Sequence, residues 1–341
     1  MADYFPILHG RAGEFDAIDQ IPDELAPHLL PIFDVAATTH GPIHDARTFS
    51  RRAQDTLPRD MTIAVDAHHL PDPATGLRRP LPDIAEDLHQ WGNPMLPVAH
   101  PHDSPARLAD IRDAAALHGH GAVLRLDPTD DDAETRAHHL LSAIDLHAEH
   151  TVLLLDAAHL RSEHDLTRAE PLVRKHLSWT HRHPWKAVVV AAGAMPRSIA
   201  HLPPNTPTPL RRFDLDLWQR LHDHHVRFAD YGIAHPRPAT GGWGPPPNLR
   251  YTDHDVWWTY RAAARDDNGN SAIHDLCRTL VAADHWPTLG RHFSWGDEQI
   301  ALRATRHATP GTARHWLAWG TSHHLAHVAN HLGLPGAPPA R

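Results

Sequence analysis

The chain has 341 residues, of which 41% are hydrophobic and 21% charged, and its formal net charge is −9 with the histidines neutral. This is the composition of a globular protein with room for one large domain or two smaller ones. The negative charge excludes the broad basic surface that non-specific nucleic-acid binding requires, although a local basic groove is compatible with it.

Histidine is unusually abundant, with 35 residues, whereas Lys175 and Lys186 are the only lysines. Abundant Arg, Ala, Pro, Asp and His beside so little lysine is what GC-rich coding produces. We therefore interpret most histidines as surface residues whose charge changes between about pH 5 and 8.

The single cysteine, Cys277, excludes an internal disulfide, and we expect it to pack in the core. The N-terminal segment lacks the basic start and apolar core of a secretory signal. No apolar run approaches the roughly 20 residues that span a bilayer. The sequence predicts a soluble, cytoplasmic protein with no membrane partner.

Short apolar runs recur along the first two thirds of the chain, and continuous runs of this kind are typical of strands buried on both faces. The intervals between them have helical patterns, for example at 104–119, 132–150 and 211–225, and the first of these has Ser104 as its N-cap. Repeated strand–helix units predict a TIM (β/α)8 barrel. An open doubly wound sheet is the alternative, but no glycine-rich phosphate loop follows the first run. The eight expected strands are 4–10, 29–37, 61–70, 93–101, 121–128, 151–160, 186–196 and 226–236.

The pattern changes after the eighth run. A Pro- and Gly-rich segment at 235–251 predicts a loop, "NLRYT" and "DVWWTYRA" predict a hairpin, and helices are expected at 271–286 and 311–333, the latter broken at Gly320. We therefore expect a barrel domain over 1–240, a C-terminal α+β extension over 241–333 that covers the barrel mouth, and a disordered tail over 334–341.

Aspartates stand at the ends of five of the expected strands, where TIM barrels carry their chemistry. Such carboxylates suit a divalent cation, Mg, Mn or Zn, or acid–base catalysis, with Arg125 beside them. Aspartates also cap helices and form turns after strands, so each one has that alternative interpretation. The residues are Asp34, Asp66, Asp127, Asp156 and Asp230, with His68, His100, His159 and His235 just beyond strand ends.

Histidines in the segment "WGTSHHLAHVANHL" have helical spacings that can hold a metal, as His323 and His327 do at i, i+4. No Glu follows the first of them, so the segment is not the HExxH pattern of metalloproteases. A hydrogen-bonding or basic role of His323 or His324 in a pocket is the other interpretation.

The segments "YFPILHGRAGEFDAI", "LLPIFDV", "FADYGI", "NLRYT", "SWGDEQI" and "WGTSHHL" occur in this order over residues 4–332. Together they resemble the Beta protein family, which is associated with phages and bacteria. The resemblance implies one domain in which barrel and tail fold together, and it hints at antiviral defence or phage–host conflict. It supplies no established activity.

The same resemblance pairs the strand ends with "SWGDE" and "HH", which implies that the tail folds back over the barrel mouth. If "SWGDE" is a strand, only one of Asp297 and Glu298 faces the pocket, and the other braces Arg303 or Arg291. Trp295 offers a flat face for a base or sugar, or merely walls the pocket.

Two functions fit these patterns. The first is a hydrolase or lyase that acts on a small polar or phosphorylated, nucleotide-like substrate. The second is a non-catalytic sensor that recognises a phage product or a partner protein from the same operon. The candidate catalytic residues are Asp66, Asp127, Asp156, Asp230, Glu298, His323 and His324; the candidate substrate-binding residues are Arg125, Tyr231, Tyr251, Trp295 and Asp297; and the candidate metal ligands are Asp34, Asp66 and Asp156.

Overall fold

The computed structural model describes residues 2–58, 61–72, 78–237, 245–264 and 270–339. The chain forms two compact units that are interleaved in sequence. The first comprises 1–10, 27–194 and 213–231, and the second comprises 11–26, 195–212 and 232–341. Residues 11–26, 195–212 and 232–237 thus join the second unit, although the sequence assigns them to a barrel domain over 1–240.

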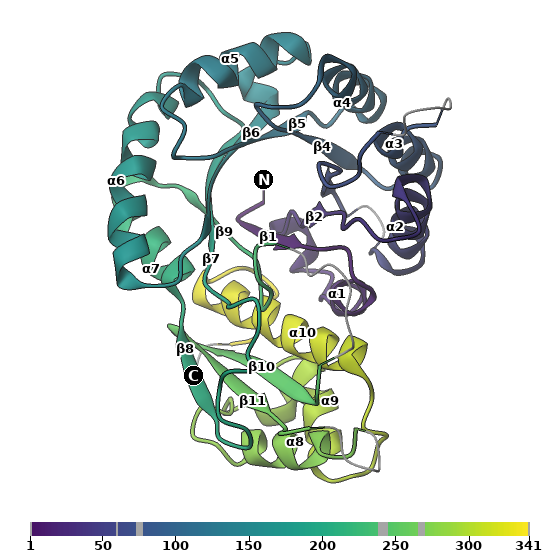
Figure 1. The fold of residues 1–341 in the computed structure, drawn as a ribbon, viewed down its shortest axis with the longest axis vertical. Coiled ribbons are helices and arrows are strands. Elements are labelled where there is room, and N and C mark those ends of the chain that lie inside the picture. The colour runs from purple at the N-terminus through teal and green to yellow at the C-terminus, as the bar shows by residue number, and fades with distance from the viewer. Residues whose placement is uncertain (1, 59–60, 73–77, 238–244, 265–269, 340–341) are drawn as a thin grey trace. The chain divides into compact units, whose positions relative to one another are not determined.

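The first unit is a closed barrel of parallel strands, and all eight expected strands are confirmed in their expected order (Figure 1). β1 and β9 close the barrel, with Phe5 opposite Ala229. The TIM-type α/β architecture predicted from the sequence is therefore correct. The strands are β1 (Tyr4–Leu8), β2 (Ile32–Asp34), β3 (Ile63–Asp66), β4 (Met95–Ala99), β5 (Ala122–Leu126), β6 (Thr151–His159), β7 (Ala187–Gly193) and β9 (Arg227–Asp230).

The barrel interior is filled by alternate residues of each strand, because successive side chains of a strand point to opposite faces. Val152 and Leu154 of β6 belong to this apolar core, as do Ala229 and Tyr231 around β9. This alternation decides which residue at each strand end faces the interior.

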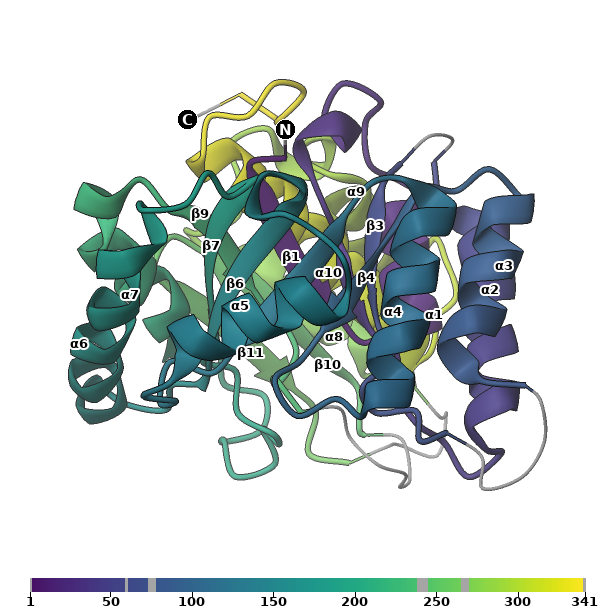
Figure 2. The same cartoon turned by 90° about the horizontal axis from the view of Figure 1, so that it is seen from above.

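Helices surround the strands of the first unit (Figure 1). α2, α3 and α4 lie side by side along the barrel (Figure 2). Ser104 caps α4 as predicted, since its Oγ accepts a hydrogen bond from the Arg107 N–H, and Gly119 ends the helix with a φ of 69°. The helices are α2 (Pro42–Thr56), α3 (Pro80–Gln90), α4 (Pro105–His118), α5 (Ala133–Ala143), α6 (Glu163–Thr180) and α7 (Phe213–Arg220).

The second unit combines an antiparallel sheet with helices. Its strands have the order β10-β11-β8, so the predicted hairpin is confirmed and gains a third strand. The apolar faces of the sheet and helices meet in a core that includes Cys277, Trp316 and Trp319. The elements are α1 (Ala12–Ile18), β8 (Thr208–Arg211), β10 (Asn248–Asp253), β11 (Val256–Arg261), α8 (Ile273–Val281), α9 (Trp295–Ala304) and α10 (Ala313–His331).

Helix α10 runs without a break through Gly320, so the interruption expected there is wrong. The residue serves close packing instead. A Cβ at this position would lie 2.7 Å from both the Arg250 carbonyl oxygen and the Ile233 Cδ1. Glycine is therefore required because the backbone of β10 passes directly against the helix.

The structure bears on two of the predicted irregular segments, the Pro/Gly-rich loop and the C-terminal tail. Residues 238–244, within the expected Pro/Gly-rich loop, lie outside the described residues, as do 340–341. Residues 334–339, where the sequence predicts disorder, form turns in which Asn330 donates a hydrogen bond to the Pro338 carbonyl. Among the described helices, none combines the length and apolar character needed to cross a membrane.

We predict that Gly320→Ala destabilises the second unit. Glycine-to-alanine changes inside helices normally stabilise by up to about 1 kcal/mol. Here the overlap with β10 should reverse the sign and cost about 1–3 kcal/mol in the free energy of unfolding. Urea denaturation measures the change. Ala326→Gly in the same helix is the control, and it should lose only about 1 kcal/mol of helix propensity; an unchanged or more stable Gly320→Ala protein would contradict the packing argument.

Candidate functional site

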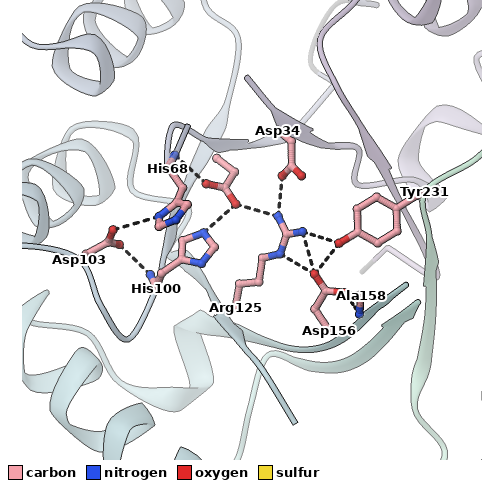
Figure 3. Close-up of polar contacts among 9 residues, drawn as sticks. Asp34, His68, His100, Asp103, Arg125, Asp156, Ala158 and Tyr231 are labelled. Carbon is pink, nitrogen blue, oxygen red and sulfur yellow. Dashed lines mark hydrogen bonds and ion pairs between the residues drawn. The ribbon is translucent and has the colours of Figure 1, made fainter. Parts of the chain in front are cut away.

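The guanidinium of Arg125 lies at the centre of a charged cluster at the carboxyl ends of the barrel strands (Figure 3). Arg125 is near the end of β5, and the residues around it come from β2, β3, β6 and the position after β9. Asp34 and Asp66 are opposite each other in the strand register. The sequence predicted that carboxylates would converge here, and the structure brings three of the five together.

Every N–H direction of the guanidinium is occupied by a protein group. Nη1 donates to Asp34 Oδ1 at 2.5 Å and to Asp66 Oδ2 at 2.8 Å. Nε donates to Asp156 Oδ2 at 2.9 Å, and Nη2 donates to the Tyr231 hydroxyl at 2.5 Å and lies 2.7 Å from Asp156 Oδ2. That hydroxyl in turn donates to Asp156 Oδ2 at 2.5 Å. One cation thus holds three carboxylates and a phenol in fixed positions.

Burial makes these charges interdependent. Burial raises the pKa of Asp34, and the neighbouring Asp66 carboxylate adds to this although Arg125 opposes it. Burial also acts to raise the pKa of Asp66, but His100 and Arg125 outweigh it and leave the pKa below its usual range. Burial would lower the pKa of Arg125, yet the surrounding carboxylates raise it. The arrangement therefore keeps Arg125 and Asp66 charged, and it makes Asp34 bind a proton at a higher pH than an exposed aspartate does.

A histidine extends the cluster toward solvent. His100 follows β4, and its Nε2 lies 2.8 Å from Asp66 Oδ2 with 17% of the side chain exposed. Its backbone N–H donates to Asp103, and Asp103 also attracts the more exposed His68, whose pKa it raises. The rings of His68 and His100 lie 4.4 Å apart. The sequence singled out His100 only as a residue beyond a strand end; its even spacing from Val98, which faces the interior, was the signal that could have identified it.

Two of the predicted strand-end aspartates do not join the cluster. Asp127 is exposed and accepts hydrogen bonds from the backbone and hydroxyl of Thr129, so it is the turn former of the alternative interpretation. Asp230 is buried but follows Ala229 and precedes Tyr231, both of which face the interior, so its own side chain faces outward, where it accepts a hydrogen bond from Tyr4 at 2.8 Å.

Asp34, Asp66 and Asp156, the predicted metal ligands, are all bound to Arg125. The position between the three carboxylates, where a cation would bind, is taken by the guanidinium. Among the described residues no group of three or more His, Cys, Asp or Glu side chains is arranged to hold a metal ion. Arg125 therefore occupies the place at which the sequence interpretation put a divalent cation, Mg, Mn or Zn.

The motif "SWGDE" begins a helix, so the expectation that it forms a strand is wrong. Ser294 is the N-cap of α9, with its Oγ accepting from the Asp297 N–H, and the Asp297 side chain turns back into the core of the second unit. Glu298 points to solvent from the first helical turn. The two adjacent carboxylates therefore face different directions. The cause is not the alternation of a strand but the rotation of about 100° between successive residues of a helix.

Asp297 is the centre of a buried hydrogen-bond network in the second unit. It accepts from the Tyr251 hydroxyl at 2.7 Å and from the Ser294 hydroxyl at 2.6 Å. His323 Nδ1 lies 2.9 Å from the same carboxylate, and the His323 ring stacks on Tyr251 at 3.6 Å. The network joins β10, α9 and α10, which explains why "NLRYT", "SWGDE" and "HH" occur together.

His323 has no nitrogen left for a ligand. Its Nδ1 contacts the Asp297 carboxylate, and its Nε2 lies 2.8 Å from the Thr252 carbonyl oxygen, so both ring nitrogens are engaged within the protein. His324 Nδ1 is engaged with the Thr252 hydroxyl at 2.7 Å. The side chains of Tyr251, Asp297, His323 and His324 are all buried, so these residues serve the interior of their unit.

The remaining residues of the motif have packing roles. Trp295 packs against the core of the second unit. Arg303 binds the Gln299 side chain and lies 4.5 Å from the centre of the Trp319 ring, and Arg291 is exposed beside His292. Neither arginine braces Asp297 or Glu298 as the sequence interpretation supposed.

We predict that Asp297→Asn destabilises the protein strongly while Glu298→Gln does not. The Asp297 carboxylate accepts hydrogen bonds from the Tyr251 and Ser294 hydroxyls. In Asn the NH2 group replaces one accepting oxygen, which leaves buried donors unsatisfied at a cost of about 3 kcal/mol. The exposed Glu298 should change the free energy of unfolding by no more than about 0.5 kcal/mol. Thermal and urea unfolding of both variants measure the change in stability. Equal stability of the two variants would show that the Asp297 network does not stabilise the fold.

We also predict a pH effect from His327. Burial, followed by nearby His323 and Arg212, lowers its pKa in the folded protein. The unfolded chain then binds a proton near pH 6.5 that the folded chain does not, so this residue reduces stability as pH falls below about 6.5. Unfolding at pH 7.5 and 5.5 should show a smaller acid-induced loss in His327→Gln than in wild type, by up to about 1.4 kcal/mol per pH unit. Identical losses would contradict the burial of this ring.

The fold and the strand-end cluster together define a TIM-type barrel with a charged, arginine-centred mouth. The sequence model of the Beta protein family matches residues 4–330, and the chain belongs to that family. No curated protein matches the sequence. Among solved structures, the chain is similar to triosephosphate isomerase from Bartonella henselae, with a TM-score of 0.36 and 12% identity over 67% of this chain and 92% of that chain.

Proposed function

We propose that the barrel is an enzyme that performs general acid–base catalysis, as a hydrolase or lyase on a small polar or phosphorylated substrate, with His100 as the proton-transfer group. One observation carries this proposal: His100 Nε2 lies 2.8 Å from Asp66 Oδ2, at the carboxyl ends of the barrel strands. A carboxylate that holds one imidazole nitrogen fixes the tautomer and leaves the other nitrogen to act as base.

The surroundings of Asp66 support this role. Arg125 and the His68 backbone N–H both bind the Asp66 carboxylate, so it is held rigidly for His100. His100 is more exposed than Arg125, with side-chain fractions of 17% against 11%, which fits a base that meets substrate while the cation stays behind it.

A proton donor is present in the same cluster. The raised pKa of Asp34 favours its protonated form nearer neutral pH than is usual for aspartate. Arg125 and Tyr231 then act as positioning residues, because their polar atoms bind the cluster's own carboxylates.

A sensor without turnover is the second candidate. It is favoured by the completeness of the Arg125 contacts, since the guanidinium has a protein partner in every direction and needs no substrate to neutralise it. In this case the barrel mouth would recognise a phage product or a partner protein through the outer residues of the cluster, His68 and His100.

The family resemblance supports placing either activity in phage–host conflict. Cells that express the wild-type protein should then resist part of a phage panel, measured as efficiency of plating, and His100→Gln should lose that protection. Equal plating on wild-type and empty-vector cells would contradict this setting.

We predict that His100→Gln abolishes turnover without loss of stability. Wild-type protein is assayed against p-nitrophenyl esters, phosphate mono- and diesters, and for exchange of acidic C–H protons in D2O. Loss of a general base should lower the rate about 100-fold or more. The exposed His139 on α5 provides the matched control, since His139→Gln should retain full rate.

The outcomes separate the two candidates. Turnover by His100→Gln at the wild-type rate would refute the role of His100. No turnover by wild type, together with ligand-induced stabilisation that His100→Gln removes, would favour the sensor.

A further inference from the structure

A second polar site lies entirely within the second unit. A cavity of about 320 Å³ there is lined by arginines from four separate parts of the chain, together with Ser198 and Asn248. A volume of this size is at the lower end of the range for small-molecule sites. The arginines are Arg11, Arg197, Arg237, Arg250 and Arg261.

The positions of the arginines follow from the fold. Arg11 is the N-cap residue of α1, Arg250 lies on β10, and Arg261 ends β11. Arg197 follows β7 and Arg237 follows β9, and both are exposed, whereas the other three are half-buried. The cavity thus has a fixed basic wall on the sheet and a more accessible basic rim.

None of these arginines has a carboxylate partner among the described residues, and no Asp or Glu of that part of the chain lines the cavity. Elsewhere in the protein, arginines such as Arg79, Arg174 and Arg314 form ion pairs with carboxylates. Like charges gathered without counterions repel one another, so the arrangement costs stability unless an anion binds.

Arg250 carries this cost most directly. Its Nη1 donates to the Ile233 carbonyl at 2.7 Å, but its Nε is buried without a hydrogen-bond partner in the described structure. Burial, with the nearby Arg11, lowers the pKa of Arg250 to about 10. A guanidinium that is desolvated and left with an unused donor is poised for an external acceptor.

We propose that this arginine cavity binds a small molecule that carries two adjacent phosphoryl groups. Five guanidiniums supply the planar, paired N–H donors that phosphate oxygens match, and they exceed what one phosphate needs. A cavity of this volume, in a chain of net charge −9, suits a compact anion and does not resemble an extended nucleic-acid surface.

The neighbouring space accommodates the rest of such a ligand. A second cavity of about 260 Å³ shares Arg11, Asn248 and Arg250 with the first, so the two adjoin. It adds Ile233 and Leu317, which give it an apolar side. A phosphorylated compound could place its charged end among the arginines and its less polar end here.

The test uses the full chain and inorganic pyrophosphate as the probe, followed by isothermal titration and thermal unfolding. Pyrophosphate should bind wild type and raise its melting temperature, and sulfate at the same ionic strength should bind at least about tenfold more weakly. The double variant Arg197→Gln/Arg237→Gln removes two exposed rim charges and should weaken pyrophosphate binding about tenfold or more. Arg250→Gln should weaken it further; because Arg250 also holds the Ile233 carbonyl, the rim variant keeps the test valid if that protein does not fold.

The control is Arg51→Gln/Arg168→Gln, which removes two exposed arginines of the barrel unit and leaves the same net charge as the rim variant. It should bind pyrophosphate like wild type. Absence of binding to wild type at millimolar pyrophosphate, or equal weakening by the rim and control variants, would overturn the proposal. Because His100 is in neither variant, the result is independent of the catalytic proposal.

Discussion

The barrel mouth depends on one interaction, the contact of the Arg125 guanidinium with three buried carboxylates. Burying a carboxylate without a partner is costly, and three of them at one end of a barrel would repel one another strongly. Arg125 removes most of this cost because it reaches Asp34, Asp66 and Asp156 at once. His100, Tyr231, the backbone turn after β3 and the backbone near the end of β6 are then organised around carboxylates whose positions the guanidinium has set.

The two units treat charge in opposite ways. In the barrel, one guanidinium is paired with three carboxylates, so its positive charge has protein partners without a ligand. In the second unit, five arginines face a cavity without a carboxylate among the described residues. A site of the first kind suits controlled proton transfer, and a site of the second kind suits binding of an anion. The proposals for the two sites follow from this difference in charge balance.

Much of the fold could be predicted from the sequence because continuous apolar runs mark strands buried on both faces. Which side chains at the strand ends face the barrel interior was harder to predict. Side chains of a strand alternate between its two faces, which puts Asp34, Asp66 and Asp156 in the barrel interior and Asp230 outside it. Strict use of this rule would have distinguished Asp230 from the three aspartates of the cluster. The interpretation of "SWGDE" as a strand overlooks a helix start, because Ser294 is an N-cap residue with the acidic Asp297 three positions later. The arginine cavity could not be predicted, since its residues lie between positions 11 and 261 and meet only through the tertiary fold.

The interleaving of the two units has a consequence for how the chain is made. Helix α1 belongs to the second unit, and its Asp16 forms a bidentate ion pair with Arg314 of α10, a residue 298 positions later. Gly13 of α1 also packs directly against α10, because a Cβ there would overlap the Arg314 carbonyl. During synthesis α1 therefore emerges early, whereas its partner α10 emerges only when nearly the whole chain has been translated. Neither unit corresponds to a continuous fragment, so truncation would leave exposed apolar surface, and the protein is expected to reach its native state late and as a whole.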